Sequence, residues 1–327
     1  MEIRQLKYFL AVADAGSLSQ AARKVLIAQS ALSKQMCALE AELGVTLFHR
    51  SNSGIVVNEA GKVFYEYALG ILKQLRDAKA AVLPGHGVLT GSIVVALPQS
   101  VSPIIALPLL QAVGRIYPQV EMQLNEELTG NLVDQLIRGS VDIALFTPTG
   151  LPAEVSFTPL IEEDLYLIHR VNDPEAPPPG EVTLAEAVAR PLVFPGKAHS
   201  HSTRAIVDQA LQQQQRAPAA VAMEVNSVYI LKSAVEAGIG PTIMPLNLVV
   251  REVAEERLVA HPFVAPGVFR TLGICTCGAR PPSNLRTLIA QLISQVVQDM
   301  CRSGEWPSTR LLPATRTRDS SSLRQQQ

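Results

Sequence analysis

The sequence has little of what marks several classes of protein. Four cysteines in 327 residues are too few for a disulfide scaffold, and they favour a reducing compartment. No window of about 18 consecutive apolar residues occurs, so we expect no membrane span. The N-terminus lacks the basic start, apolar run and cleavage site of a secretion signal, which predicts a cytoplasmic protein. A net charge of −1 excludes coating of nucleic acid through bulk charge, so any DNA binding requires a local patch.

What is present is an ordinary folded composition with an uneven distribution of charge. Hydrophobic residues make up 47% and charged residues 17%, and the length allows two or three domains. Residues 1–89 contain 10 Lys/Arg and 7 Asp/Glu, a net of +3, whereas residues 90–327 contain 18 and 22, a net of −4. A basic front and an acidic remainder indicate two modules with different partners.

Three short segments near the N-terminus carry apolar residues at helical spacing, over 3–14, 17–24 and 29–43. Gly16 ends the first segment, and residues 26–28 form a tight connection between the second and the third. Two short helices joined by a tight turn, the second with a polar face, form the helix-turn-helix pattern.

The polar face of segment 29–43 carries Gln29, Ser30, Ser33 and Lys34 in two adjacent rows, because residues four apart lie on one side of a helix. Glutamine can pair with adenine, and lysine can reach guanine or a phosphate. We expect these four side chains to read the major groove of DNA. Periodicity alone fits a solvated face of a small helical bundle equally well.

Two short apolar runs follow, at 45–50 and 54–57, and they flank a polar turn. This pattern predicts a hairpin wing, which would complete a winged helix-turn-helix domain over residues 1–58. Arginine, hydroxyl and amide groups suit backbone phosphates, which position a protein on DNA without reading its sequence. The expected phosphate-contacting residues are Arg50, Ser51, Asn52 and Ser53.

A dense set of motifs spans residues 3–62. These motifs are Gly16-Ser17, Ala21-Ala22, Ala31-Leu32-Ser33, Leu39-Glu40, Leu43-Gly44, Leu47-Phe48 with Arg50, and Asn58-Glu59-Ala60-Gly61. Together they resemble the DNA-binding region of the LysR-type transcriptional regulators. The stretches that are similar to the nitrogen-assimilation-control type are Leu6-Lys7-Tyr8-Phe9 and Ile27-Ala28-Gln29. Two positions depart from the family pattern, since Ala28 replaces a Ser or Thr cap and Ser30 replaces a common proline.

The resemblance implies a transcriptional regulator that binds a promoter operator in duplex DNA and is modulated by a small-molecule effector. It also implies homotetramers assembled from dimers. RNA polymerase is a further candidate partner, and no membrane is expected.

A single apolar stripe runs along residues 59–82 at spacings of three and four, which is typical of one long helix. The stripe consists of Ala60, Phe64, Tyr67, Ile71, Leu75, Ala78 and Val82. Such a helix needs a partner, either its own domain or the same helix of a second subunit, and the resemblance favours a homodimer. Residues 84–87 then form a Pro/Gly hinge, so we expect residues 59–90 to act as a linker.

Downstream of the linker, strands alternate with helices, which predicts a multidomain α/β protein. Residues 91–302 resemble the two-lobed effector-binding domain of the same family, which is itself similar to periplasmic binding proteins. Lobe I would comprise about 91–160 and 268–302, and lobe II about 161–267. The polar, aperiodic residues 303–327 are expected to form a disordered tail.

In parallel sheets, ligands bind beyond the carboxyl ends of the strands, where helix N-termini offer N–H groups. The residues at these positions are mostly hydroxyl- and amide-bearing and would bind a small polar effector, although each could instead cap its own helix. They are Gln99, Ser100, Ser102, Thr129, Phe146, Thr147, His201 and Asn226.

An enzyme or a metal protein is a less favoured alternative. No G-x-S-x-G, P-loop or H-E-x-x-H string occurs, so no catalytic residue is assigned. Cys275-Thr276-Cys277 has the wrong spacing for a zinc half-site, and His199 and His201 have no matching cysteine or acidic cluster nearby. We therefore expect no metal, and no cofactor other than the effector. A solute receptor without gene control would fit the two lobes but not the helix-turn-helix.

Overall fold

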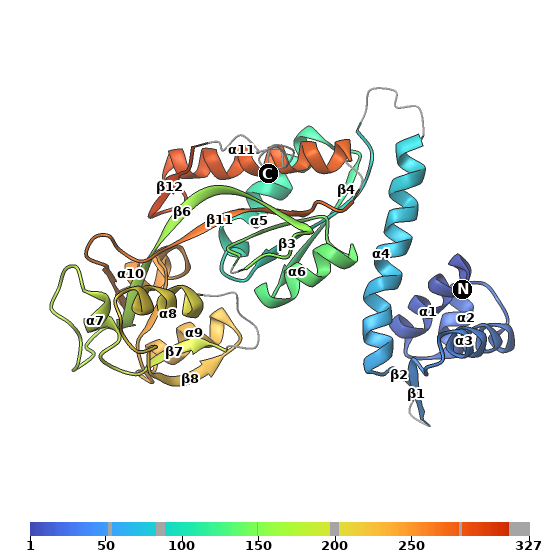
Figure 1. Ribbon diagram of the computed structural model, residues 1–327, viewed down its shortest axis with the longest axis horizontal. Coiled ribbons are helices and arrows are strands. Elements are labelled where there is room, and N and C mark those ends of the chain that lie inside the picture. The colour runs from blue at the N-terminus through green and yellow to red at the C-terminus, as the bar shows by residue number, and fades with distance from the viewer. Residues whose placement is uncertain (52–53, 83–88, 149, 197–202, 281–282, 314–327) are drawn as a thin grey trace, which may run out of the picture.

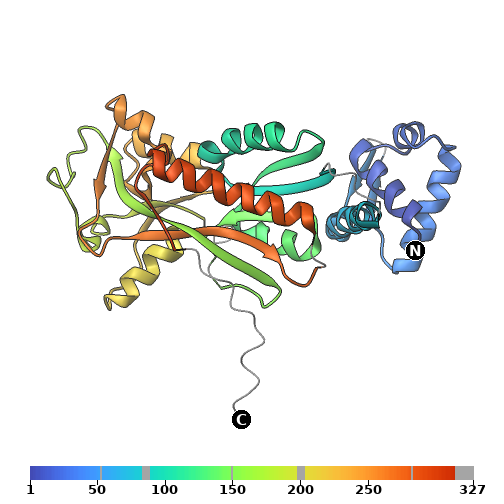
Figure 2. The same ribbon diagram turned by 90° about the horizontal axis from the view of Figure 1, so that it is seen from above.

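The computed structural model consists of a small helical head, one long helix and a two-lobed α/β domain (Figure 1). It describes residues 1–51, 54–82, 89–148, 150–196, 203–280 and 283–313. Seen from above, the head lies at one end of the molecule, apart from both lobes (Figure 2). The long helix, α4 (Glu59–Val82), lies between the head and the nearer lobe. This arrangement confirms the predicted fold class.

The head is built from the three predicted helices and a two-stranded hairpin. They are α1 (Ile3–Ala15), α2 (Leu18–Lys24), α3 (Gln29–Leu43), β1 (Phe48–Ser51) and β2 (Gly54–Val57). Helices α1 and α3 end where Gly16 and Gly44 adopt φ angles of 60° and 70°, a left-handed conformation that glycine reaches without strain. The side chain of Ser17 accepts a hydrogen bond from the Gln20 N–H and so begins α2, as the sequence predicts.

The core of the head also holds the start of α4. Phe9 and Leu39 are fully buried, and the ring of Phe9 packs edge-on against Phe64 of α4, with centroids 4.9 Å apart. Gly61 of α4 approaches the carbonyl oxygen of Leu47 so closely that a Cβ atom would overlap it. Helix α4 is therefore fixed to the head.

Another face of α4 leaves apolar side chains in solvent. Val63, Tyr67 and Ile71 are 50%, 47% and 39% exposed. Phe64, which belongs to the same predicted stripe as Tyr67 and Ile71, packs on the core of the head. Within one chain, part of the stripe is therefore covered by the head, and part of it is exposed to solvent.

The α/β domain contains two lobes that share a mixed sheet. The elements of lobe I are β3 (Gly91–Pro98), α5 (Ser102–Ile116), β4 (Val120–Glu127), α6 (Thr129–Arg138), β5 (Ile143–Phe146), β11 (Phe269–Cys277), α11 (Asn284–Ser303) and β12 (Thr309–Leu311). Those of lobe II are α7 (Leu184–Ala187), β7 (Leu192–Pro195), α8 (Thr203–Gln213), β8 (Val221–Val225), α9 (Val228–Glu236), β9 (Thr242–Pro245), η2 (Leu246–Leu248), α10 (Val250–Ala254) and β10 (Leu258–Pro262). Strand β6 (Val155–Arg170) runs through both lobes.

The order of the main sheet is β10-β6-β11-β5-β3-β4, with β9 and β12 also paired to β6. Strand β3 pairs in parallel with β4 and β5, as the predicted β–α–β units require. Strand β11 is antiparallel to both β5 and β6, so the sheet is mixed rather than parallel throughout. Hydrophobic pattern predicts a strand only over 164–169, and β6 begins earlier, at Val155. Its first half contains Pro159, which donates no backbone hydrogen bond, and the charged Glu163, whose partners Arg270 and Trp306 are distant in the sequence.

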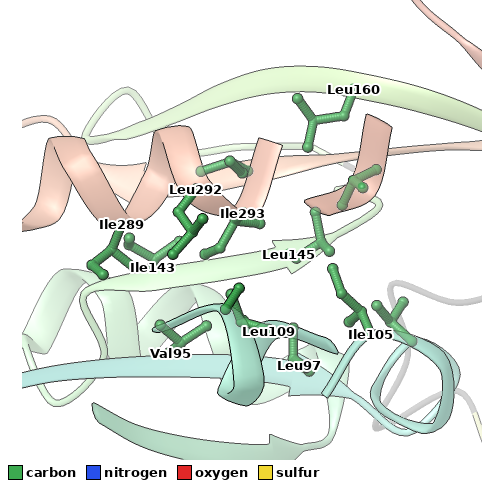
Figure 3. Close-up of a cluster of buried hydrophobic side chains, with 14 of the residues drawn as sticks. Val95, Leu97, Ile105, Leu109, Ile143, Leu145, Leu160, Ile289, Leu292 and Ile293 are labelled. Carbon is green, nitrogen blue, oxygen red and sulfur yellow. The ribbon is translucent and has the colours of Figure 1, made fainter. Parts of the chain in front are cut away.

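Lobe I is organised around an apolar core between the sheet and two helices (Figure 3). Val95 and Leu97 of β3, Ile105 and Leu109 of α5, and Ile293 of α11 are all fully buried in it. Burial of each such side chain contributes about 1.5–3 kcal/mol. The packing holds the carboxyl ends of the strands in fixed positions.

Residues 303–313 are ordered, so the prediction of a disordered tail is wrong for them. Trp306 is 1% exposed, and its Nε1–H donates a hydrogen bond of 2.7 Å to Oε1 of Glu163. Strand β12 then pairs with β6, and we name residues 304–312 the C-terminal clip. The clip is held by the Trp306–Glu163 hydrogen bond and by the pairing of β12 with β6. Neither contact requires apolar residues at regular spacing, so the sequence shows no periodic pattern there. The remainder of the expected tail, 314–327, lies outside the described residues.

Candidate DNA-reading helix and interlobe cavity

Helix α3 presents the predicted polar face outward. Gln29, Ser30 and Lys34 are exposed and Ser33 is half-buried, whereas Leu32 on the inner side is fully buried. The first turn of α3 contains no acidic residue, so no carboxylate there repels a phosphate. Packing of the head uses the apolar side of α3 and leaves the polar side accessible to a partner.

The N-terminus of α3 also suits an anion. Ala28 makes no side-chain cap, which leaves first-turn N–H groups to meet a phosphate. Ser19 Oγ donates a hydrogen bond of 3.0 Å to Oε1 of Gln29. This bond orients the Gln29 amide and leaves its NH2 group to donate outward.

The hairpin wing is anchored to the turn between α1 and α2. The carbonyl oxygen of Gly16 accepts the Ile55 N–H at 2.9 Å. Gly54, with φ of 131°, lies against the same oxygen, where a Cβ atom would be 2.9 Å away. The position of the hairpin is therefore set by backbone contacts. The predicted phosphate contacts of residues 50–53 fall outside the side chains that the structure describes.

A hydrogen bond from α4 strengthens its attachment to α1. Tyr65 Oη donates to Oδ1 of Asp14 over 2.6 Å. Burial first, and then this bond to a carboxylate, raise the pKa of Tyr65 to about 12. The phenol stays protonated at neutral pH, so the bond persists there.

A cavity between the two lobes brings together most of the residues predicted to bind an effector. Its volume is about 90 Å³. The predicted residues that line it are Gln99, Ser100, Thr129, Phe146, Thr147 and Asn226. Ser102 does not line it, because this residue already belongs to α5 and successive helical residues turn by roughly 100°. His201 falls outside the described residues.

The wall of the cavity contains a buried arginine that the sequence analysis missed. Arg270 donates from Nη1 to Ser100 Oγ over 2.8 Å and from Nε to Glu163 Oε2 over 2.6 Å. An arginine has no acceptor, so Ser100 accepts this bond and its own proton can be donated to a group in the cavity. Arg270 lies within a strand, and only the folded chain shows that it meets Glu163 and Ser100.

Hydrogen bonds also define the lobe II side of the cavity. The Val228 N–H at the start of α9 donates to Gln99 Oε1 over 3.2 Å and so links the lobes. Thr147 Oγ1 is buried and has no hydrogen-bond partner within the described residues. Because an unsatisfied buried hydroxyl is costly, Thr147 marks a place where a ligand or a water completes the bonding.

Two other properties follow from the described part of the chain. It contains no group of three or more His, Cys, Asp or Glu side chains that could hold a metal ion. None of its helices combines the length and apolar character needed to cross a membrane.

A head with an outward polar helix, a linker helix and a two-lobed domain with a cavity define a ligand-responsive, DNA-binding transcriptional regulator. Residues 3–62 match the family model of the bacterial regulatory helix-turn-helix proteins of the lysR family, and residues 86–297 match the LysR substrate binding domain. The chain belongs to the LysR family of transcriptional regulators. It is a regulator rather than an enzyme or a solute receptor without gene control.

Individual relatives agree with this assignment. The chain is 35% identical to the nitrogen assimilation regulatory protein nac of Klebsiella aerogenes over 246 residues, which cover 75% of this chain and 78% of that protein. It is 29% identical to the HTH-type transcriptional regulator BbuR of Bordetella bronchiseptica over 311 residues, 92% of each chain. The predicted resemblance to the nitrogen-assimilation-control type is thereby confirmed.

Solved structures show the same fold. The crystal structure of CbnR, a LysR family transcriptional regulator, has a TM-score of 0.65 and 24% identity, and covers 90% of this chain and 99% of that one. The structure of full-length CbnR with its target DNA has a TM-score of 0.64 and 25% identity, and covers 91% and 99%.

Proposed function

We propose that the chain binds a duplex DNA operator through α3 as a dimer, and that a small polar effector in the interlobe cavity modulates this binding. The observation that carries the proposal is the outward polar face of α3, whose opposite side forms the core of the head. The structure of CbnR with its target DNA supports it, because that regulator has a similar fold. The similarity to nac supports target genes of nitrogen assimilation.

Each polar residue of the α3 face has a role that fits its chemistry. The NH2 group of Gln29 donates to a base edge, and Lys34 reaches guanine or a phosphate. The hydroxyl groups of Ser30 and Ser33 can donate or accept a hydrogen bond. The wing residues 50–53 would hold phosphates and set the orientation of α3 on the duplex.

A dimer would bring two copies of α3 to one side of the duplex. The surface on which a second α4 would pack is formed by Ile71 and by the parts of Val63 and Tyr67 that remain exposed beside Arg138 of the same chain. A two-fold dimer reads an operator with two half-sites. Two dimers would then form the tetramer that the family resemblance implies, in the cytoplasm, with RNA polymerase as a further partner.

The effector would be small and polar and would bind without a metal or another cofactor. The Ser100 hydroxyl can donate to it, and Thr147 Oγ1 is an unsatisfied group that it would engage. Thr129 and Asn226 add polar groups from the start of α6 and from the turn before α9. The effector would shift the population of subunit arrangements by binding one of them more tightly.

Operator DNA selected from random duplexes by the full-length protein tests the proposal. Replacing both Ser33 and Lys34 by alanine is expected to weaken operator binding about tenfold or more, since good base contacts each contribute about 1–3 kcal/mol. Affinity of the unmodified protein is expected to fall steeply as salt rises, because phosphate contacts release counterions.

The matched control is Arg251→Ala, which removes a positive charge from a side chain that is 84% exposed in lobe II. It is expected to bind the operator as the unmodified protein does. Operator affinity that is unchanged in the Ser33/Lys34 variant would refute the role of α3.

A further inference from the structure

Helix α6 has one end at the cavity and the other at the linker helix. At its N-terminal end, Leu128 and Thr129 line the cavity. At its C-terminal end, Arg138 contacts α4. The ten residues of α6 span about 15 Å. Leu132 and Leu136 on its inner face are fully buried, so the two ends of this short helix are expected to move together.

The contact between α6 and α4 is too close for a side chain. A Cβ atom at Gly70 of α4 would overlap the carbonyl oxygen of Arg138. Beside this contact, the Arg138 guanidinium lies over the ring of Tyr67, 5.5 Å from its centroid. The backbones of the two helices therefore touch directly at Gly70.

One turn further along α4, a buried ion pair joins this helix to the segment between α6 and β5. Lys73 Nζ lies 2.7 Å from Asp142 Oδ1, and the two side chains are 5% and 6% exposed. Asp142 Oδ2 also accepts the Val94 N–H at 2.8 Å, and the Arg280 guanidinium lies 3.7 Å from Oδ1. Because breaking a buried pair leaves an uncompensated charge, this ion pair holds α4 against lobe I.

We propose that α6 transmits the state of the cavity to the DNA-binding head through its contact with α4. The residues of this contact and of the adjacent ion pair, Gly70, Lys73, Arg138 and Asp142, are named the linker joint. A ligand that engages Thr129 displaces α6, and the linker joint passes the displacement to α4 and so to the head. The inference rests on the proposed function, because it requires DNA at the head and a ligand in the cavity. Linkage then requires bound DNA to change the ligand affinity of the cavity by the same factor.

A double-mutant cycle on the full-length protein tests this coupling. In it, a tryptophan side chain introduced at position 129 takes the place of the ligand. Thr129→Trp places a large group at the cavity end of α6. Gly70→Ala opens the linker joint, because its methyl group overlaps the Arg138 carbonyl oxygen. The matched control is Gly114→Ala on α5, a helical glycine whose Cβ would meet nothing within 4 Å. Affinity for the selected operator is measured by gel-shift titration, and folding by circular dichroism.

In the otherwise unmodified chain, Thr129→Trp is expected to change operator affinity about fivefold or more, as is typical of coupling between sites. In the Gly70→Ala background the change is expected to shrink below about twofold, so the effects of the two substitutions are not additive. In the Gly114→Ala background it keeps its full size.

The inference is overturned if Thr129→Trp changes operator affinity equally in the Gly70→Ala and Gly114→Ala backgrounds. It is also overturned if Thr129→Trp leaves operator affinity unchanged in every background, including the otherwise unmodified chain. Lys73→Met is the second joint variant, since it removes the charge and keeps the length of the side chain. Should Gly70→Ala fail to fold, the cycle with Lys73→Met gives the same two outcomes. A protein that selects no DNA at all contradicts the proposed function, whereas DNA binding with an additive cycle contradicts the role of α6 alone.

Discussion

Glu163 is fully buried and accepts hydrogen bonds from two sides, from Arg270 at 2.6 Å and from Trp306 at 2.7 Å. A buried carboxylate is tolerated only when such partners compensate for its lost hydration. Arg270 in turn holds Ser100 at the cavity wall. At the scale of single residues, a side chain of the C-terminal clip is therefore linked to a side chain of the cavity by three consecutive hydrogen bonds.

Replacing Trp306 by phenylalanine removes one donor to Glu163 and leaves an aromatic ring in the same site. We expect the free energy of unfolding to fall by about 1–3 kcal/mol, the cost of an unsatisfied buried polar group. Urea titration followed by far-UV circular dichroism measures the change. The control Tyr229→Phe alters an aromatic residue that is 76% exposed, and it should shift stability by less than about 0.5 kcal/mol. Equal stability of the two variants would contradict the role of the Trp306–Glu163 bond.

The residues of the cavity and of the linker joint differ in whether local sequence pattern predicts their roles. Ser100 and Thr129 could be predicted, because a rule about strand ends and helix starts selects polar residues from local pattern alone. Arg270 and Lys73 could not, since each acquires its role from a carboxylate far away in the chain, Glu163 and Asp142. Buried ion pairs depend on tertiary packing and leave no periodic signal.

At the scale of elements, β6 and β10 are joined by two stacked histidines as well as by their backbone. Nε2 of His169 lies 2.9 Å from Nε2 of His261, and the ring planes are inclined by 21°. The Nδ1 atoms lie 2.8 Å from the Arg170 carbonyl oxygen and 2.9 Å from that of Gly180. A carbonyl oxygen accepts, so each Nδ1 carries the proton of its ring, and two neutral rings have no hydrogen between their Nε2 atoms.

This pair predicts that the protein is less stable in acid. Burial lowers the pKa of His169 below its usual 6.5, and the nearby His261 lowers it further. The unfolded chain therefore takes up a proton before the folded chain does. Above about pH 6.5 this histidine is neutral in both states and costs no stability. Below that pH the free energy of unfolding falls, by at most about 1.4 kcal/mol per pH unit for one proton.

Urea titrations between about pH 7.5 and 5.5 measure this slope. His169→Gln is expected to flatten it, while His49→Gln, at an exposed position of the wing, should leave it unchanged. A slope that is the same in His169→Gln as in the unmodified protein would show that other groups cause the acid sensitivity.

Elements with their own apolar periodicity were predictable from sequence, and those defined by pairing were not. Helix α3 matches its expected bounds of 29–43, since one apolar face and a terminal glycine specify it locally. The first half of β6 and the whole of β12 depend on neighbours, because Glu163 and Trp306 fit a strand and a core only once they meet. The sequence-based prediction therefore fails at the strand that runs through both lobes, β6, and at β12, which pairs with it.

At the scale of the whole molecule, the open stripe on α4 is the clearest sign of a larger assembly. Contiguous apolar side chains in solvent indicate an interface. Ile71→Glu would place a charge in that interface and is expected to convert dimers into monomers, as measured by sedimentation velocity at micromolar concentration. The control is Val56→Glu in the wing, where valine is 64% exposed. Monomers in both variants, or dimers in both, would exclude α4 as the dimer surface.

Trp306 is the single tryptophan of the chain, and its position gives it a use beyond structure. Its indole emission arises from one site, next to the carboxylate that holds Arg270 at the cavity wall. A compound that displaces Arg270 would alter the electric field around the indole and so shift the emission. The unlabelled protein thus carries an intrinsic optical reporter with which candidate effectors can be screened before any target gene is identified.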